Sequence, residues 1–129
     1  MARDNIKAFS LIELIVVIII LGILAAISIP AFQKTQERAF DNDAKASLKL
    51  IQSAEKIYRL ETGFYYPPGS TDGNHSTINT NLRLSLPVTT SKWNYTVDGT
   101  TGESQAVRSG GPDIRTWELP IDQEDPSLK

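Results

Sequence analysis

Residues 9–32 read FSLIELIVVIIILGILAAISIPAF, and this stretch decides the fold. Of its 24 residues, 19 are Ala, Val, Ile, Leu or Phe, whereas from Gln33 to Lys129 only 29 of 97 residues are apolar or aromatic. As a helix that rises about 1.5 Å per residue, the segment is about 36 Å long, enough to cross a bilayer core of about 30 Å. We therefore expect a transmembrane helix over residues 9–32.

The eight residues before this segment, MARDNIKA, carry Arg3 and Lys7 against one Asp4. Positive charge ahead of an apolar helix predicts that the N-terminus stays in the cytoplasm and that the rest of the chain is exported. A cleaved secretory signal peptide is the alternative, with a small-x-small site at residues 26–28. The core of a signal peptide usually has about 7–15 residues, so the length of this segment and its helical continuation from Gln33 favour a retained anchor.

One carboxylate, Glu13, lies inside the apolar segment. A charge near the membrane centre costs several kcal/mol unless it finds a partner or reaches water. In one interpretation Glu13, one helical turn from the membrane edge, simply reaches water. In the other, cleavage just before Phe9 creates an α-amino group that pairs with the Glu13 of a neighbouring chain inside a packed helical core.

Charged residues return after Phe32, but the helical spacing continues through residues 33–62. Steps of three and four predict one buried stripe, formed by Phe40, Ala44, Ser47, Leu48, Ile51, Ala54, Glu55 and Tyr58. The opposite face, expected to meet water or neighbouring molecules, carries Lys45, Lys49, Gln52, Lys56 and Arg59. The stripe does not sustain a heptad, which favours packing against a sheet over a coiled coil. Gly63 ends the helix.

Residues 63–129 are expected to form an exported head. Residues 64–81, FYYPPGSTDGNHSTINTN, are rich in Pro, Gly, Ser, Thr and Asn and indicate a loop, with the aromatic residues 64–66 packed under the head. The apolar spacing of residues 78–88 fits a helix and a strand equally well, and Pro87 ends either element.

Alternating apolar residues predict strands in the second half of the head. Trp93, Tyr95 and Val97 alternate before the turn dipeptide Asp98-Gly99, and Ser104 to Arg108 form a candidate middle strand. Near the C-terminus the alternation returns, at Trp117, Leu119 and Ile121. The predicted fold class is α+β: a long N-terminal helix packed on an antiparallel sheet of three or four strands.

The stretch from Ala8 to Pro30 resembles the N-terminal signature of type IV pilins and type II secretion pseudopilins. The resemblance rests on a short basic leader, an aromatic residue at the start of the mature chain, an acidic residue four positions later and a proline that kinks the helix. It implies that a prepilin peptidase removes residues 1–8 by cleaving between Ala8 and Phe9, and that Phe9 is then N-methylated. The family usually has Gly before the cut, so Ala8 implies slower processing.

The resemblance further implies a pilin-like fold and a homo-oligomeric helical filament whose core is built from residues 9–32, with Phe9, Glu13, Gly22 and Pro30 as assembly residues. Local melting between Gly22 and Pro30 would let the anchor leave the bilayer. The alternative is that Pro30 only marks the membrane exit. The implied partners are prepilin peptidase, an assembly ATPase, an inner-membrane platform protein and minor pilins or pseudopilins.

The segment from Ser109 to Glu118 faintly resembles the end of major pseudopilins, where an acidic loop can hold calcium. Asp98, Glu103 and Asp113 are the candidate oxygen ligands for such a site, although their spacing does not match the twelve-residue helix-loop-helix motif. Turn formation by Asp98 is the alternative. No other cofactor is expected.

Composition excludes several kinds of function. The chain of 129 residues has no Cys, a single His75 and a net charge of −2, which exclude a disulfide scaffold, a thiolate zinc site, a histidine metal triad and nucleic-acid binding by the monomer through a broad basic surface. No catalytic constellation is present, so we expect a structural subunit and not an enzyme.

The function expected from these features is that of a type II secretion pseudopilin that supports protein export. The chain lacks the pair of C-terminal cysteines of many type IV pilins, which favours this choice. A surface pilus for adhesion, twitching or DNA uptake is the first alternative, and a single-pass anchored periplasmic binding module is the second. We expect the chain in a bacterial inner membrane with a periplasmic head, and afterwards in a periplasmic or surface filament.

Overall fold

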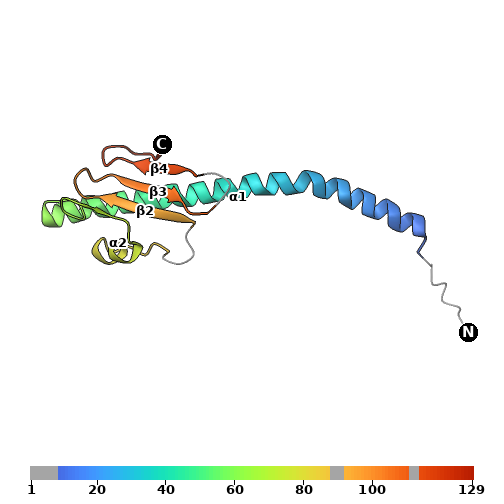
Figure 1. Cartoon of the computed structure of the whole chain (residues 1–129), viewed down its shortest axis with the longest axis horizontal. Coiled ribbons are helices and arrows are strands. Elements are labelled where there is room, and N and C mark those ends of the chain that lie inside the picture. The colour runs from blue at the N-terminus through green and yellow to red at the C-terminus, as the bar shows by residue number, and fades with distance from the viewer. Residues whose placement is uncertain (1–8, 88–91, 111–113) are drawn as a thin grey trace, which may run out of the picture. The chain divides into compact units, whose positions relative to one another are not determined.

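The computed structural model of the chain describes residues 9–87, 92–110 and 114–129. Over these ranges the chain forms two helices and five strands, and Figure 1 labels both helices and the strands β2, β3 and β4. The chain divides into two compact units, Met1–Arg38 and Ala39–Lys129. The elements follow in the order α1 (Leu11–Thr62), β1 (Thr71–Asp72), α2 (His75–Asn81), β2 (Trp93–Asp98), β3 (Ser104–Arg108), β4 (Thr116–Leu119) and β5 (Ser127–Leu128). The predicted α+β class is confirmed.

Helix α1 begins two residues after Phe9 and ends at Thr62, as its spacing predicts. The stop is built by Gly63, which adopts a φ of +86° and donates its N–H to the Arg59 carbonyl at 2.8 Å. A left-handed residue after the last turn satisfies a helix carbonyl that has no partner within the helix, and glycine adopts that conformation without a steric penalty.

The sheet is an antiparallel meander in the order β1-β2-β3-β4-β5. Strands β2 and β3 lie where alternation predicts them. The expectation of three or four strands is wrong, because the two-residue strands β1 and β5 pair along the outer edges of the sheet. Ile121 also lies outside the sheet, since β4 ends at Leu119 and the chain turns after Pro120.

The segment from residue 64 to residue 81 is not the continuous loop that its composition predicts. It contains β1 and the helix α2, whose first turn is capped by the Asn74 side chain accepting the Ser76 N–H at 2.9 Å. The sequence left open whether residues 78–88 form a helix or a strand. In the structure the helix ends at Asn81, and residues 84–87 have no regular structure. Val88, the last residue of that stretch, lies outside the described residues.

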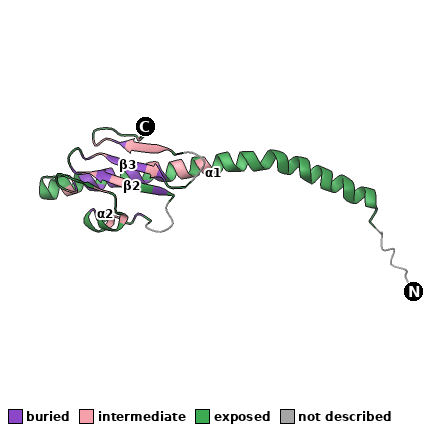
Figure 2. Ribbon diagram, viewed as in Figure 1, coloured by how far each residue is buried: buried purple, intermediate pink, exposed green. Residues whose placement is uncertain are grey.

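The core lies between the predicted stripe of α1 and one face of the sheet (Figure 2). Ala44, Leu48 and Ile51 are fully buried there, together with Trp93 and Tyr95 of β2. Trp93 also anchors the sheet to the helix, because its indole N–H donates to the Phe40 carbonyl at 2.9 Å. The prediction that this helix stripe receives the sheet is confirmed.

Two side chains of the unit Ala39–Lys129 differ from expectation. Gln52, predicted on the exposed face, is only 7 % exposed, and its amide nitrogen donates to the carbonyls of Pro120 at 2.9 Å and Gln123 at 2.7 Å. Phe64, predicted under the head, is 64 % exposed, whereas its neighbour Tyr66 is buried. Long-range hydrogen bonds explain the burial of Gln52, because the C-terminal segment that covers it contributes carbonyl acceptors.

Candidate assembly site

The first turn of α1 places Glu13, one of the predicted assembly residues, at a capped helix start. Glu13 stands three residues after Ser10, and its Oε2 accepts the Ser10 backbone N–H at 3.3 Å. The first helical bond joins the Leu14 N–H to the Ser10 carbonyl at 3.2 Å. This is one half of a capping box, in which a Glu reaches back to the residue that begins the helix. A carboxylate is also favourable at this end of the helix dipole.

The hydrogen bond from the Ser10 N–H to Glu13 was not predicted from the sequence, although Ser10-Leu11-Ile12-Glu13 has the S-x-x-E spacing that indicates a capping box. The sequence offered two interpretations of Glu13, contact with water and pairing with the Phe9 amine of a neighbouring chain. The bond to the Ser10 N–H adds a third, that Glu13 caps its own helix. In the single chain the carboxylate has a local partner, the Ser10 N–H in its own helical turn. Phe9, whose amine is the expected partner after cleavage, is 74 % exposed. Ala8 lies outside the described residues.

The apolar part of α1 is exposed in the described part of the chain. By length and composition α1 is the one helix, in the part of the chain that the structure describes, that could cross a membrane, and none of its most apolar window is buried. Its large side chains between Leu11 and Phe32 are 42–75 % exposed. Apolar area of this extent is stable only against lipid or other helices.

Gly22 and Pro30 both lie inside the continuous helix α1. A Cβ on Gly22 would meet no atom within 4 Å, so the surface of the helix is open there. Pro30 has no N–H to donate to the Ala26 carbonyl, which removes one helical bond. The Ser28 hydroxyl, which donates to the Leu24 carbonyl at 2.8 Å, lies on the same stretch. The assembly roles of Gly22 and Pro30 stay predictions.

Of the three candidate calcium ligands, Asp98 and Glu103 lie within the described residues. Asp98 and Glu103 flank the β2–β3 turn, where the Thr100 N–H donates to Asp98 Oδ1 at 2.8 Å and lowers the pKa of that carboxyl. Asp113 lies outside the described residues. Within the described ranges no group of three or more His or acidic side chains could hold a metal ion. Asp98 therefore acts as a turn residue, and the calcium site stays a prediction.

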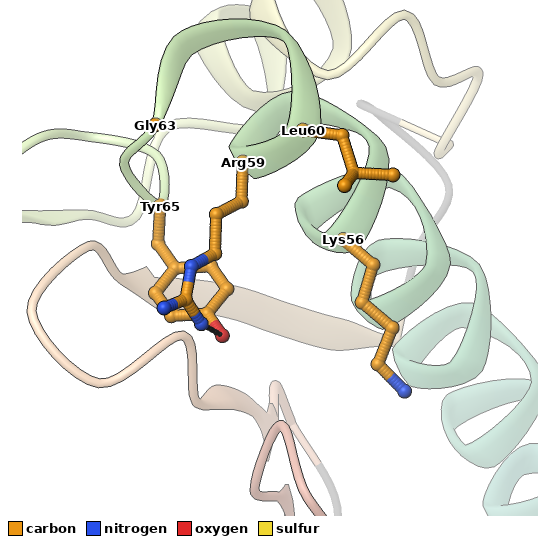
Figure 3. Close-up of a pocket in the computed structure, with 5 residues that line it drawn as sticks. All are labelled: Lys56, Arg59, Leu60, Gly63 and Tyr65. Atoms are coloured by element: carbon orange, nitrogen blue, oxygen red, sulfur yellow. Dashed lines mark hydrogen bonds between the residues drawn. The ribbon is translucent and has the colours of Figure 1, made fainter.

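The far end of α1 carries a shallow hollow lined by Lys56, Arg59, Leu60, Gly63 and Tyr65 (Figure 3). The Arg59 guanidinium stacks on the Tyr65 ring, 4.6 Å from the ring centre, and also bonds the Tyr65 hydroxyl. Lys56 and Leu60 point away from this stacked pair.

One buried carboxyl was expected only as part of the helix stripe. Glu55 is 1 % exposed; its Oε2 accepts the Tyr66 N–H at 2.9 Å, and no hydrogen bond reaches its buried Oε1 from the described residues. Burial raises the pKa of Glu55 to about 7, and the bond from Tyr66 opposes this rise. The position of Glu55 inside an apolar stripe was the sequence signal for its burial.

The first turn of α1 and the apolar segment behind it match a known family model. Residues 3–29 match the prokaryotic N-terminal methylation motif. The chain carries that motif. The resemblance of its N-terminal segment to type IV pilins and type II secretion pseudopilins is thereby confirmed.

Several known proteins are similar to part of the chain. The type IV major pilin protein PilA of Myxococcus xanthus is 46 % identical over 59 residues, which are 46 % of this chain and 27 % of that protein. The type II secretion system core protein G of Pseudomonas aeruginosa is 40 % identical over 67 residues, 52 % of this chain and 46 % of that protein. Competence protein ComGC of Streptococcus pneumoniae is 32 % identical over 59 residues, 46 % of this chain and 55 % of that protein.

The matched part of the chain thus spans about half or less of the length of each of these relatives. No solved structure matches the chain.

Proposed function

We propose that this chain is a structural subunit of a type IV pilus-like filament, and specifically a type II secretion pseudopilin that supports protein export. The observation that carries the proposal is the exposed apolar segment of α1 with a single carboxylate, Glu13, in its first turn. The similarity to type II secretion core protein G of several bacteria supports the choice of system.

The proposed sequence of events begins in the inner membrane, with the N-terminus cytoplasmic and the head periplasmic. Prepilin peptidase cleaves between Ala8 and Phe9, and Phe9 is N-methylated. An assembly ATPase and a platform protein then move the subunit into a filament with other pilins or pseudopilins. Burial of the apolar segments, at about 25 cal/mol per Å², and pairing of Glu13 with a neighbour's Phe9 amine hold the core together.

In this proposal the segment between Gly22 and Pro30 is the weak part of the anchor. Glycine lowers helix stability by about 1 kcal/mol relative to alanine, and the proline removes a backbone hydrogen bond. A helix weakened there can unwind locally as it passes from lipid into the filament.

A type IV pilin of a surface fibre is the second candidate function. The identity of 46 % to the PilA protein over 59 residues favours it. Electron microscopy separates the two candidates: a surface pilin gives long fibres outside the cell, whereas a pseudopilin at its native level gives none and is required for export of a secreted enzyme.

The first test is the mass of the native protein. We expect a mature N-terminus at Phe9 that carries one additional methyl group. An N-terminus near Ile29 would indicate an ordinary signal peptide and would contradict the proposal.

The second test separates the two roles of Glu13. Glu13→Ala removes both the charge and the acceptor for the Ser10 N–H, whereas Glu13→Gln removes the charge and keeps an acceptor, because Gln also completes a capping box. We expect both variants to lose filament assembly while their heads stay folded. Normal assembly of Glu13→Gln would show that capping, and not charge pairing, is what Glu13 provides.

A further inference from the structure

The single histidine of the chain, His75, joins α2 to β2. It is the first residue of α2, and this helix lies beside β2 (Figure 1). The side chain is partly buried, and its Nε2 accepts the backbone N–H of Tyr95 at 3.0 Å. Nδ1 lies 3.3 Å from the carbonyl oxygen of Pro87, and the centres of the His75 and Tyr95 rings are 5.4 Å apart. One ring therefore connects three segments of the unit Ala39–Lys129.

The Tyr95 N–H lies on an edge of the sheet that β1 is too short to cover. β1 pairs only with the last two residues of β2. Two residues after β1 the chain turns into α2, because Asn74 is the cap of that helix. Gly73 still lies along the edge, since a Cβ built on it would be 3.9 Å from the Tyr95 carbonyl oxygen. The His75 ring thus supplies the acceptor that a longer β1 would offer to Tyr95.

The bond from Tyr95 fixes where the neutral ring carries its hydrogen. A ring nitrogen that accepts an N–H carries no hydrogen itself, so the hydrogen of neutral His75 is on Nδ1, toward the Pro87 carbonyl. When an imidazole gains a proton, both of its nitrogens become donors. Two donors, Nε2–H and the Tyr95 N–H, would then face each other, and the bond between them is lost. Histidine ordinarily changes its charge between about pH 5 and pH 8.

No charged side chain among the described residues is paired with His75. The ionisable residues on the surrounding segments are Asp72 on β1, Arg83 after α2, and Lys92, Tyr95 and Asp98 on or beside β2. None of them forms an ion pair with His75 in the described ranges. Arg83 pairs with Glu61, and Asp98 accepts the Thr100 N–H. Residues 84–87 contribute no ionisable side chain.

Asp72 is the carboxylate nearest to His75 along the chain. Its Oδ1 accepts the Asn74 N–H at 2.8 Å, and its Oδ2 accepts the hydroxyls of Tyr66 and Thr77. Burial acts to raise the pKa of Asp72, but the hydrogen bonds, that from Thr77 first, hold it below its usual value. Asp72 therefore stays ionised between about pH 5 and pH 8, and its titration does not coincide with that of a histidine.

We propose that His75 is a pH-sensitive switch at the β2 edge of the sheet: the neutral ring holds α2 against β2, and protonation loosens this contact. The contact weakens as pH falls, because the bond from Tyr95 is complete only while Nε2 has no proton. The inference goes beyond the proposed function, since it concerns the head alone and applies equally to a pilin and a pseudopilin.

The first measurement is nitrogen NMR of the imidazole in the full-length natural chain in detergent. At about pH 8 we expect the chemical shift of an unprotonated nitrogen at Nε2 and that of a protonated nitrogen at Nδ1. This measurement needs no variant. The opposite assignment would show that Tyr95 does not donate to Nε2 and would overturn the proposal.

Hydrogen exchange then measures the opening of the contact. Between about pH 8 and pH 5 we expect exchange in α2 and at the Tyr95 amide, corrected for the intrinsic effect of pH on exchange, to become about five- to tenfold faster. This factor corresponds to the loss of one hydrogen bond. Strand β3 is the internal reference, and its corrected exchange relative to that of α2 should fall. Equal protection of α2 at both pH values would contradict the switch.

Two variants assign the effect to His75. His75→Gln places an amide oxygen close to the position of Nε2 but cannot gain a proton, so we expect slow exchange in α2 at both pH values. His75→Ala has no acceptor, so we expect fast exchange at both. If exchange in His75→Gln accelerates with acid as much as in the natural chain, another group is responsible and the proposal is wrong.

The comparison with His75→Gln also removes the contribution of Glu55. Burial raises the pKa of Glu55 to about 7, so this carboxyl gains its charge in the same range of pH. Its effect has the opposite sign, because a buried charge weakens the head as pH rises. Since Glu55 is present in both chains, the difference between them at each pH reports on His75 alone.

Discussion

Glu55 shows how a single residue couples the head to pH. Its side chain is almost fully buried, and only one of its oxygens has a hydrogen-bond donor among the described residues, the N–H of Tyr66 at 2.9 Å. Burial favours the neutral carboxyl and raises its pKa from 4.5 to about 7. Between these two values the folded chain holds a proton that the unfolded chain has released, so the free energy of unfolding falls as pH rises.

We expect Glu55→Gln to remove this dependence. Between about pH 4 and pH 8 the free energy of unfolding of the natural chain should fall, relative to that of Glu55→Gln, by up to about 3 kcal/mol, the value of the cited pKa difference. The measurement is chemical denaturation in detergent at a series of pH values, followed by the fluorescence of Trp93 and Trp117. Glu124→Gln, which removes one exposed carboxyl, is the control. A difference between Glu55→Gln and the natural chain that does not vary with pH would contradict the assignment.

Gly99 lies where the backbone of another segment, at Pro67, leaves no room for a side chain. A Cβ at Gly99 would lie 1.8 Å from the Pro67 carbonyl oxygen, because the β2–β3 turn packs directly on the chain that leaves α1. We expect Gly99→Ala to force the two backbones apart and to lower the free energy of unfolding by about 1–3 kcal/mol. Gly73→Ala is the control, since its nearest neighbour would be 3.7 Å away. Thermal unfolding of both variants checks the difference, and equal melting temperatures would count against it.

At the scale of elements, Gln52 ties α1 to the end of the chain. Its amide satisfies carbonyls of the segment after β4, at Pro120 and Gln123. We expect Gln52→Ala to leave these carbonyls without a donor, at a cost of about 1–3 kcal/mol, and to speed hydrogen exchange in residues 120–129 first. Ser53→Ala, one position along on the exposed face, is the control. Uniform exchange across the head would show that Gln52 has no local role.

The elements also show what sequence can and cannot predict. Helix α1 and strands β2 and β3 follow local rules, because the spacing of Leu48, Ile51 and Tyr58 and the alternation at Trp93, Tyr95 and Val97 reflect one buried face. Strand β5 consists of two residues defined by pairing with β4, and helix α2 has the sequence HSTINTN with one buried residue, Ile78. Neither carries a periodic signal.

The candidate assembly residues could be predicted from the sequence, whereas the long-range contacts of the chain could not. Phe9, Glu13, Gly22 and Pro30 were predicted from their arrangement along the chain. The match to the methylation motif covers residues 3–29, which include the first three and end just before Pro30, and the roles of all four stay predictions. The hydrogen bond between the Ser10 N–H and Glu13 also has a local signal, the S-x-x-E spacing of residues 10–13. The contacts of Gln52 and Glu55 were out of reach, since their partners lie 68–71 and 11 residues further along the chain.

On the scale of the whole molecule, the apolar segment should fix where the chain resides. Ile20 lies at its midpoint, where an Asp costs about 2.5–3.5 kcal/mol on insertion scales. We expect Ile20→Asp to shift a large part of the chain out of the membrane fraction, whereas Ile20→Leu stays in it. Alkaline extraction of membranes measures the change. Full retention of Ile20→Asp would show that the segment is held by something other than lipid.

The sheet ends on both sides in a strand of only two residues, Thr71–Asp72 on one edge and Ser127–Leu128 on the other. A longer open edge invites a strand from another molecule, which is the first step of aggregation. If many heads pack side by side, as the proposed function requires, each edge offers its neighbours hardly any unpaired backbone N–H and C=O groups. Close packing of many copies can therefore proceed without the sheets fusing into a continuous fibre of strands.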